Sequence, residues 1–346
     1  MLQPLSHAPD TTALPRPYLL FLGDTDEPGH AKTAFGLRDW APDYCLGEFS
    51  CGAKVTTGLP SLTPAEARAK GARGLVIGVA NSGGFIPQAW IPSLLNALES
   101  GLDIISGMHT RLAELPQLKA AATLHGRRLI DVRQPPPNLP IATGRKRTGK
   151  RLLTLGTDCA VGKKYTALAL ARAFRARNVA TDFRATGQTG ILIAGGGIAI
   201  DAVVSDFAAG AAEILSPDAA PDHWDVIEGQ GSLLHPAYAG VSLALLHGSQ
   251  PDLVVVCHEQ NRTHLLGHSE FPISSIEQII DLTLRLGRRT NPAIRCAGVS
   301  LNTGGMDAGQ AENLLKEESK RLGMIVADPM RGGDAFERLV DACHAK

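Results

Sequence analysis

Cysteine, aromatic residues and long apolar runs are all scarce in this sequence, and each shortage narrows what the chain can be. Its 346 residues include six cysteines and no C-x-x-C pair. That pattern excludes a disulfide-stapled domain and a Cys-based zinc motif, and it is typical of reduced thiols in the cytoplasm. No stretch approaches the ~20 apolar residues of a membrane-spanning helix, and the first residues lack the basic and apolar segments of a signal peptide. We therefore expect a cytoplasmic protein that does not bind membranes.

An excess of charge of one sign is also missing. Lys+Arg and Asp+Glu number 34 each, so no overall field draws the chain to nucleic acid. The basic residues at 145–150 have no aromatic residues beside them and are interpreted as a solvated linker. His264 and His268 have i,i+4 spacing but lack the glutamate of the H-E-x-x-H motif. The sequence thus predicts neither a nucleic-acid partner nor a metal.

What the sequence does contain is enough apolar material for two domains. Apolar residues make up 44% of the chain, and the length exceeds that of one average domain. The segment RQPPPNLPIATGRKRTGKR at 133–151 has three consecutive prolines and a charged tail, which cannot continue a helix or a central strand. We predict a first domain at 1–135, a linker at 136–150 and a second domain at 151–346.

The first domain alternates strands and helices. Apolar strands are expected at 18–23 and 73–80, each followed by a polar loop, with a helix at 90–101 and further strands after it. Strand–helix–strand alternation predicts a parallel, Rossmann-like sheet. The G-x-G-x-x-G motif of dinucleotide-binding proteins does not follow the first strand, so no dinucleotide site is expected.

The second domain restarts with the strand RLLTLG, a glycine-containing loop and a helix at 163–176. The later apolar runs, including those at 224–229 and 251–259, are unbroken, as in strands covered on both faces. Ser275 with Gln278 is typical of a capping box that opens a helix at 276–288. We expect an α/β chain whose Rossmann-like N-terminal domain precedes a P-loop, doubly wound parallel-sheet domain.

The loop between that strand and helix reads G-x-x-x-x-G-K, the spacing of a phosphate-binding loop. Glycines allow successive backbone N–H groups to converge on an anion, a lysine adds charge, and the helix N-terminus adds its dipole. A plain glycine-rich turn is the alternative. The residues predicted to bind a cofactor are Gly156, Thr157, Asp158, Cys159, Ala160, Val161, Gly162, Lys163, Lys164 and Tyr165.

Lys164 stands where such loops carry the Ser or Thr whose hydroxyl holds Mg²⁺. A loop without that hydroxyl suits a phosphate compound that reacts without a metal. The alternative is that Lys164 points to solvent and Thr166 or a carboxylate holds the metal.

Longer segments around these motifs resemble the sequences of known families. GTDCAVGK is similar to the G-T-D-x-x-V-G-K loop of dethiobiotin synthetase, an ATP-dependent P-loop enzyme. IEGQGS resembles that family's E-G-x-G segment and places Glu228 at the carboxyl edge of the sheet, and GVSLNT places Asn302 at a nucleobase-contacting position. Lys164 departs from that family's Thr.

The whole chain more closely resembles a bacterial and archaeal two-domain family, long classed as of unknown function. The segments HAKTAFGL, GTDCAVGKKYTAL and EGQGSLLHPAYAG carry the likeness, which runs from about 18 to 341. The family has a Rossmann-like and a P-loop domain, and its members include D-glutamate N-acetyltransferases. The resemblance implies acetyl transfer from acetyl-CoA to an acidic D-amino acid, with D-glutamate as the first candidate. The diphosphate and 3′-phosphate of coenzyme A would explain the second lysine of the loop.

Such a transfer needs a base for the amine and donors for the oxyanion. Glu228 is the first candidate for the base, with His235 and His258 as alternatives. Glu228 could instead serve a Mg²⁺ ion, and a lone histidine near a strand end is more often structural than catalytic. The polar loops of the first domain are candidates for holding the acceptor across a cleft, or they are simply exposed. The predicted substrate-binding residues are His30, Lys32, Thr33, Asn81 and Ser82.

Two rival functions remain open. One is an ATP-dependent ligase or kinase that uses Mg-ATP, and the other is a non-catalytic nucleotide-binding regulator. Lys164 weighs against the first, and Glu228 with the polar loops weighs against the second. In either case we expect a small-molecule ligand and a homo-oligomer.

Overall fold

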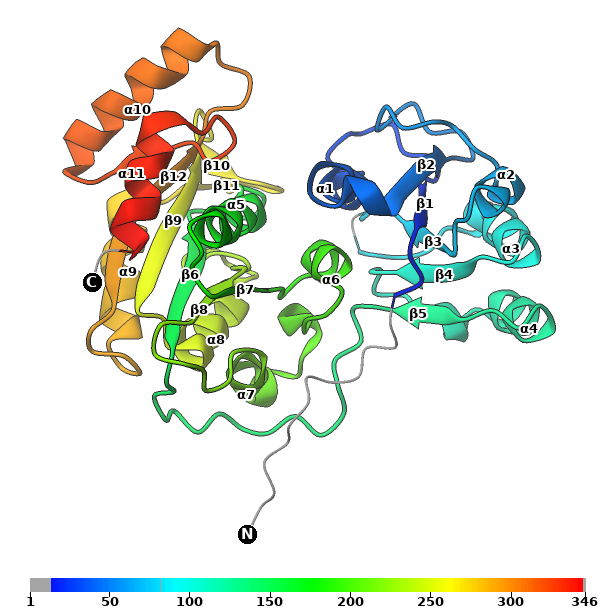
Figure 1. Cartoon of the computed structure of the whole chain (residues 1–346), viewed down its shortest axis with the longest axis horizontal. Helices are drawn as coiled ribbons and strands as arrows, with labels where there is room; N and C mark the ends of the chain where they lie inside the picture. Colours follow the sequence, from blue (N-terminus) through cyan, green and yellow to red (C-terminus); the bar gives the residue numbers. More distant parts are fainter. Residues whose placement is uncertain (1–13, 82, 345–346) are drawn as a thin grey trace. The chain divides into compact units, whose positions relative to one another are not determined.

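The computed structural model of the chain describes residues 14–81 and 83–344. It contains two α/β units, each with its own parallel sheet (Figure 1). The described residues up to 135 form one unit together with 188–199, and the other unit comprises 136–187 and the described residues from 200 onward. The expected fold class is confirmed, and the chain passes back into the first unit for one short segment.

The first unit has five parallel strands in the order β2-β1-β3-β4-β5. Its helices follow the strands, and short 3-10 turns occur at Pro42–Tyr44, Gln88–Trp90 and Leu112–Glu114. The elements are β1 (Tyr18–Phe21), α1 (Lys32–Trp40), β2 (Cys45–Phe49), α2 (Pro64–Ala69), β3 (Gly74–Ile77), α3 (Ile91–Glu99), β4 (Asp103–Ser106), α4 (Pro116–Leu124) and β5 (Leu129–Asp131).

Alternate residues of these strands pack into two separate apolar layers. Leu19 and Phe21 lie in the layer with helices α2, α3 and α4, whereas Leu20 lies in the layer with α1. Leu192 of helix α6 (Gln188–Ala194) belongs to the second layer. Burial on both faces explains why the strands read as unbroken apolar runs.

Two elements of the first unit differ from the sequence prediction. Residues 24–37 were expected to form a polar loop, but helix α1 begins at Lys32. Strand β2 was not expected, because its sequence CLGEF is short and interrupted by glycine and glutamate. Strand β2 is held by pairing with β1, and helix α1 by contacts with α6 and β3, rather than by a strong local pattern.

The second unit has six parallel strands in the order β13-β12-β9-β6-β8-β7. Helices α5 and α11 contact one face of the sheet, and α8 and α9 contact the other (Figure 1). A separate antiparallel hairpin, β10–β11, follows β9. The elements are β6 (Lys150–Gly156), α5 (Lys163–Ala176), β7 (Thr181–Arg184), η4 (Ile200–Ala202), α7 (Ser205–Leu215), β8 (Trp224–Ile227), α8 (Ala239–Ser249), β9 (Leu253–Glu259), β10 (His264–Leu265), β11 (His268–Pro272), α9 (Ile276–Gly287), β12 (Arg295–Asn302), α10 (Ala308–Leu322), β13 (Val326–Ala327) and α11 (Gly333–His344).

Local signals were reliable in this unit. Helix α5 spans the predicted residues 163–176. The Ser275 hydroxyl accepts from the backbone N–H of Gln278, whose side chain accepts from the Ser275 N–H, so the predicted capping box opens α9. Among the described residues, none of the helices combines the length and apolar character needed to cross a membrane.

The solvated-linker interpretation is wrong for part of 145–150. Arg147 is buried, and its guanidinium donates to the carbonyl oxygens of Ser216 and Gly248 at 2.6 and 2.8 Å. Burial lowers the pKa of Arg147 to about 10. Lys150 already belongs to strand β6. Arg147 and Lys150 therefore belong to the folded start of the second unit and not to a solvated linker.

Candidate active site at the phosphate loop

Strand β6 delivers the phosphate loop to the carboxyl edge of the second sheet, between β8 and β9. Gly162 has φ +102°, in the left-handed region that favours glycine, and it turns the chain into helix α5. Lys163 is buried, and its ammonium donates to the carbonyl oxygen of Asp158 at 2.6 Å. The lysine therefore hydrogen-bonds back to its own loop, which lies at the N-terminus of a helix. Loops arranged in this way bind anions.

Asp158 ties this loop to the hairpin that follows β9. Its side chain is buried, and Oδ1 accepts from the N–H of Cys159 at 2.6 Å. Oδ2 accepts from the guanidinium of Arg262 and from the N–H of Leu266, both at 2.8 Å. Arg262 also donates to the carbonyl oxygen of Cys159 at 2.7 Å and pairs with Glu259. The Asp158 carboxylate therefore braces the loop.

Glu228 follows strand β8 directly and is buried beside the loop. Its Oε2 accepts from the backbone N–H groups of Thr186 and Gly187 at 3.0 and 3.1 Å. Burial raises the pKa of Glu228, while the charge of Lys164 and the two amides act in the opposite direction. A carboxylate with a raised pKa is a stronger base than an exposed one.

The residue after Glu228 has no room for a side chain. A Cβ on Gly229 would lie 1.7 Å from the carbonyl oxygen of Thr154 and 3.3 Å from Cδ of Lys163. The Gly229 N–H donates to the hydroxyl of Thr154 at 3.0 Å. The predicted proximity of the phosphate loop and the end of β8 is confirmed.

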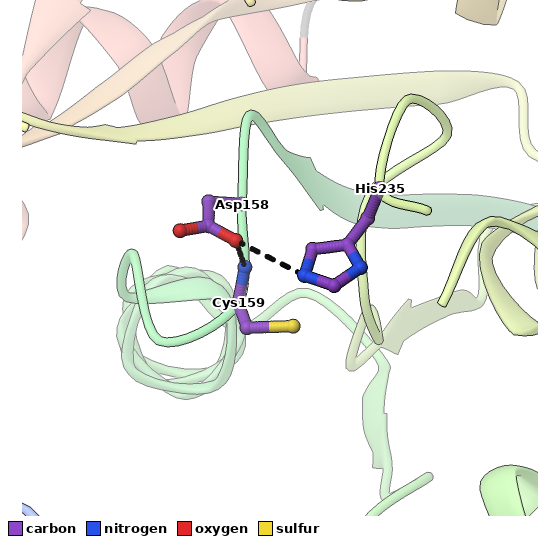
Figure 2. A group of neighbouring side chains, drawn as sticks. All are labelled: Asp158, Cys159 and His235. Carbon is purple, nitrogen blue, oxygen red and sulfur yellow. Dashed lines mark hydrogen bonds and ion pairs between the residues drawn. The ribbon is translucent and has the colours of Figure 1, made fainter. Parts of the chain in front are cut away.

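His235 lies in the loop after β8 and faces Asp158 and Cys159 (Figure 2). Its Nδ1 accepts from the N–H of Ala237 at 3.1 Å, so in the neutral ring the proton is on Nε2. Nε2 lies 3.8 Å from Oδ1 of Asp158, too far for a hydrogen bond, and within the described chain it has no hydrogen-bond partner. Burial lowers the pKa of His235, which keeps the ring neutral.

His258 occupies the opposite side of the loop, near the end of strand β9. Its Nδ1 shares a hydrogen bond of 2.8 Å with the hydroxyl of Thr157. Burial lowers its pKa. The three predicted base candidates thus surround one loop, but only Glu228 has a raised pKa and an anionic form.

The two hydroxyl positions considered for a magnesium ligand do not provide one. Lys164 replaces the hydroxyl residue, and Thr166 directs its hydroxyl at the Ser300 hydroxyl at 2.7 Å in the buried interior. Thr166 is therefore not the substitute ligand considered from the sequence. The cations Lys163, Lys164 and Arg262 instead suit phosphate oxygens.

Family models match both parts of the chain. Residues 48–135 match a Rossmann-like domain of unknown function, DUF1611_N. Residues 140–340 match the P-loop domain of unknown function, DUF1611_C. The chain belongs to this DUF1611 family.

Named relatives cover nearly the whole length of this DUF1611 protein. A D-glutamate N-acetyltransferase from Tritonibacter scottomollicae is 50% identical over 332 residues, 95% of this chain and 98% of that protein. Another, from a Pseudoalteromonas species, is 48% identical over 320 residues, 92% of this chain and 96% of that one. The crystal structure of a DUF1611 family protein from Anabaena variabilis has a TM-score of 0.85 at 31% identity and covers 95% of this chain and 99% of its own. The chain is an enzyme of the acyltransferase class.

Four of the five predicted substrate-binding residues are described by the structure, and these lie in the first unit, where they differ in exposure. Thr33 is buried, and its hydroxyl shares a hydrogen bond of 3.0 Å with that of Thr189. Asn81 closes its own loop through two hydrogen bonds to the backbone of Phe85. His30 lies 3.6 Å from Glu27, and Lys32 is exposed. Ser82 lies outside the described residues, and the acceptor role of this set stays a prediction.

Asn302 ends strand β12, where its Oδ1 accepts from the N–H of Gly304 at 3.0 Å. Its nucleobase contact also stays a prediction. Arg262, which pairs with Asp158, was not predicted from the sequence. Its position three residues after a strand-end glutamate is the only sign of this role in the local sequence.

Proposed function

We propose that this protein transfers an acetyl group from acetyl-CoA to the amino group of an acidic D-amino acid, with D-glutamate as the acceptor. The observation that carries the proposal is the identity of about half of all residues, over nearly the whole chain, with two relatives named D-glutamate N-acetyltransferase. The relatives' acceptor is thereby proposed for this chain as well.

The phosphate loop supports acetyl-CoA as the donor. Loop N–H groups of 158–164, with Lys163 and Lys164, would hold the phosphates of coenzyme A. No phosphoryl group moves in acetyl transfer, so a metal to neutralise a leaving phosphate is unnecessary. The lysine at 164 therefore suits this reaction better than an ATP-dependent one.

Glu228 is proposed to take the proton that the ammonium of the acceptor must lose before it attacks the thioester. The two backbone amides bind Oε2, which leaves Oε1 as the oxygen to accept the proton. His235 presents a neutral Nε2–H and is better suited to donate a hydrogen bond than to act as the base.

Thermal-shift measurements with acetyl-CoA, CoA, ATP–Mg²⁺ and GTP–Mg²⁺ test the choice of donor. A ligand at 100-fold its Kd stabilises the folded protein by about 2.7 kcal/mol. The proposal expects acetyl-CoA and CoA to raise the Tm without added metal. A shift with ATP–Mg²⁺ and none with either coenzyme A compound would favour the ligase or kinase alternative.

A further inference from the structure

One of the six cysteines differs from the other five in its place in the fold. Burial raises the pKa of the other five thiols: to about 12 for Cys45 and Cys343, to about 11 for Cys257 and Cys296, and in the same direction for the exposed Cys51. Cys159 is partly exposed and lies inside the phosphate loop. Raised pKa values make these five thiols less reactive, although Cys51 is exposed.

The surroundings of Cys159 favour a negative charge. The buried ammonium of Lys163 interacts electrostatically with the Cys159 thiol. Arg262 donates to the carbonyl oxygen of Cys159, and the loop opens helix α5, whose N-terminus is positive. Asp158 is the neighbouring anion, and Arg262 pairs with it at 2.8 Å. Thiols at helix N-termini beside cations ionise more readily than ordinary ones.

His235 supplies an independent observation at the same place. Its buried Nε2–H is aimed at Asp158 and Cys159 without a hydrogen-bond partner in the described residues (Figure 2). One ring nitrogen of His235, Sγ of Cys159 and one oxygen of Asp158 all lie within 4.8 Å of one another. A thiolate sulfur would provide the acceptor that this donor lacks.

The same three side chains have the donor types of a transition-metal site. Two features oppose that reading. A metal on Nε2 needs a lone pair there, but the Ala237 N–H bond to Nδ1 places the proton on Nε2. Lys163 and Arg262 also surround the position with positive charge. A hydrogen-bond acceptor, not a metal ion, therefore suits Nε2 of His235.

We propose that Cys159 is a reactive thiol that exchanges with low-molecular-weight disulfides such as glutathione disulfide, and that the mixed disulfide blocks the phosphate loop. The Cys159 thiolate attacks one sulfur of the disulfide, the S–S bond breaks, and the second sulfur leaves as a thiolate that takes a proton from water. The attached group then occupies the space in which phosphate oxygens would bind. This inference requires only an anion-binding loop and does not depend on acetyl transfer.

The test is the rate of modification of the whole protein by glutathione disulfide at neutral pH, followed by peptide mass mapping. Cys159 should react about 10-fold or more faster than the exposed Cys51. Inorganic pyrophosphate should slow Cys159 and leave Cys51 unaffected, and dithiothreitol should release the adduct. Cys51→Ser is the matched control and should leave the Cys159 rate unchanged.

The His235→Gln variant tests whether the reactivity of Cys159 depends on the Nε2–H donor of His235 or only on the exposure of the thiol. The variant should slow the reaction of Cys159 and leave that of Cys51 unchanged, with folding checked by circular dichroism. Equal rates at Cys159 and Cys51 in the wild-type protein would overturn the proposal. Protection of Cys159 by Zn²⁺ but not by pyrophosphate would overturn it in favour of a metal site. The wild-type comparison remains decisive if the variant fails to fold.

Discussion

The ammonium of Lys163 and the carbonyl oxygen of Asp158 are joined by a hydrogen bond of 2.6 Å across the turn of the phosphate loop. Burial lowers the pKa of Lys163, because its positive charge is unfavourable away from water. A bound anion would offset this unfavourable free energy. The loop is thus arranged for a negatively charged ligand.

Replacing Lys163 by alanine should therefore weaken acetyl-CoA binding. A charge-assisted hydrogen bond contributes about 1.5–3 kcal/mol, so the KM for acetyl-CoA should rise roughly 10- to 100-fold. Steady-state kinetics measure this, and circular dichroism checks the fold. Lys54→Ala, at an exposed pair with Asp26 in the first unit, is the control and should change nothing. Unchanged acetyl-CoA kinetics in folded Lys163→Ala would remove coenzyme A from the loop.

Glu228→Gln should retain coenzyme A affinity and lose general-base catalysis, about 10²- to 10⁴-fold in kcat. The wild-type rate should rise with pH through a pKa above the usual 4.5 of glutamate, because burial raises the Glu228 pKa and only the anion accepts a proton. That limb of the pH profile should vanish in the variant. Near-normal kcat in Glu228→Gln, with activity lost in His258→Ala or His235→Ala, would assign the base to a histidine.

The same pKa shift has a consequence for stability. A carboxyl group whose pKa is raised in the folded state holds its proton more tightly there, so its contribution to stability is present below pH 4.5 and is lost as the pH rises through the folded-state pKa. Glu228→Gln, which is neutral at every pH, should therefore gain Tm relative to wild type as the pH increases from 4 to 8. A Tm difference that is constant over this range would contradict the raised pKa.

Gly229→Ala should destabilise the second unit. Its Cβ would lie 1.7 Å from a backbone oxygen of β6, and relief requires backbone shifts that cost about 1–3 kcal/mol or more. The Tm should fall accordingly. Gly240→Ala is a matched control in helix α8, where a Cβ meets nothing within 4 Å, and should be neutral or slightly stabilising. Equal Tm values for both variants would contradict the close packing of Gly229.

Activity should survive EDTA. Lys164 replaces the usual metal-binding hydroxyl, and Thr166 bonds to Ser300 instead. Initial rates before and after chelation measure this, with Mg²⁺ added back as the control. Complete loss on chelation, followed by recovery with Mg²⁺, would contradict the metal-independent mechanism.

The elements that the sequence predicted are those with strong local signals. An apolar strand ending in a glycine loop and helix placed Lys163 correctly, and parallel strands necessarily brought Glu228 to the same edge. The capping box at Ser275 depends only on residues three apart and was also correct.

Contacts between distant segments escaped prediction because no local pattern encodes them. Arg262 reaches Asp158 only because the hairpin folds back over the loop. Arg147 is buried because carbonyl groups of two other segments receive its guanidinium. The return of 188–199 to the first unit depends on packing against α1. The Nε2–H of His235, which has no hydrogen-bond partner among the residues that the structure describes, likewise arises only from the meeting of two loops.

The most direct test of the central claim is product formation by the purified protein from acetyl-CoA and D-glutamate, followed by mass spectrometry in the absence of ATP and added metal. We expect N-acetyl-D-glutamate and free CoA in equal amounts, at a rate that falls in Lys163→Ala and Glu228→Gln. Absence of the acetylated product, or its appearance only when ATP and Mg²⁺ are supplied, would contradict the account.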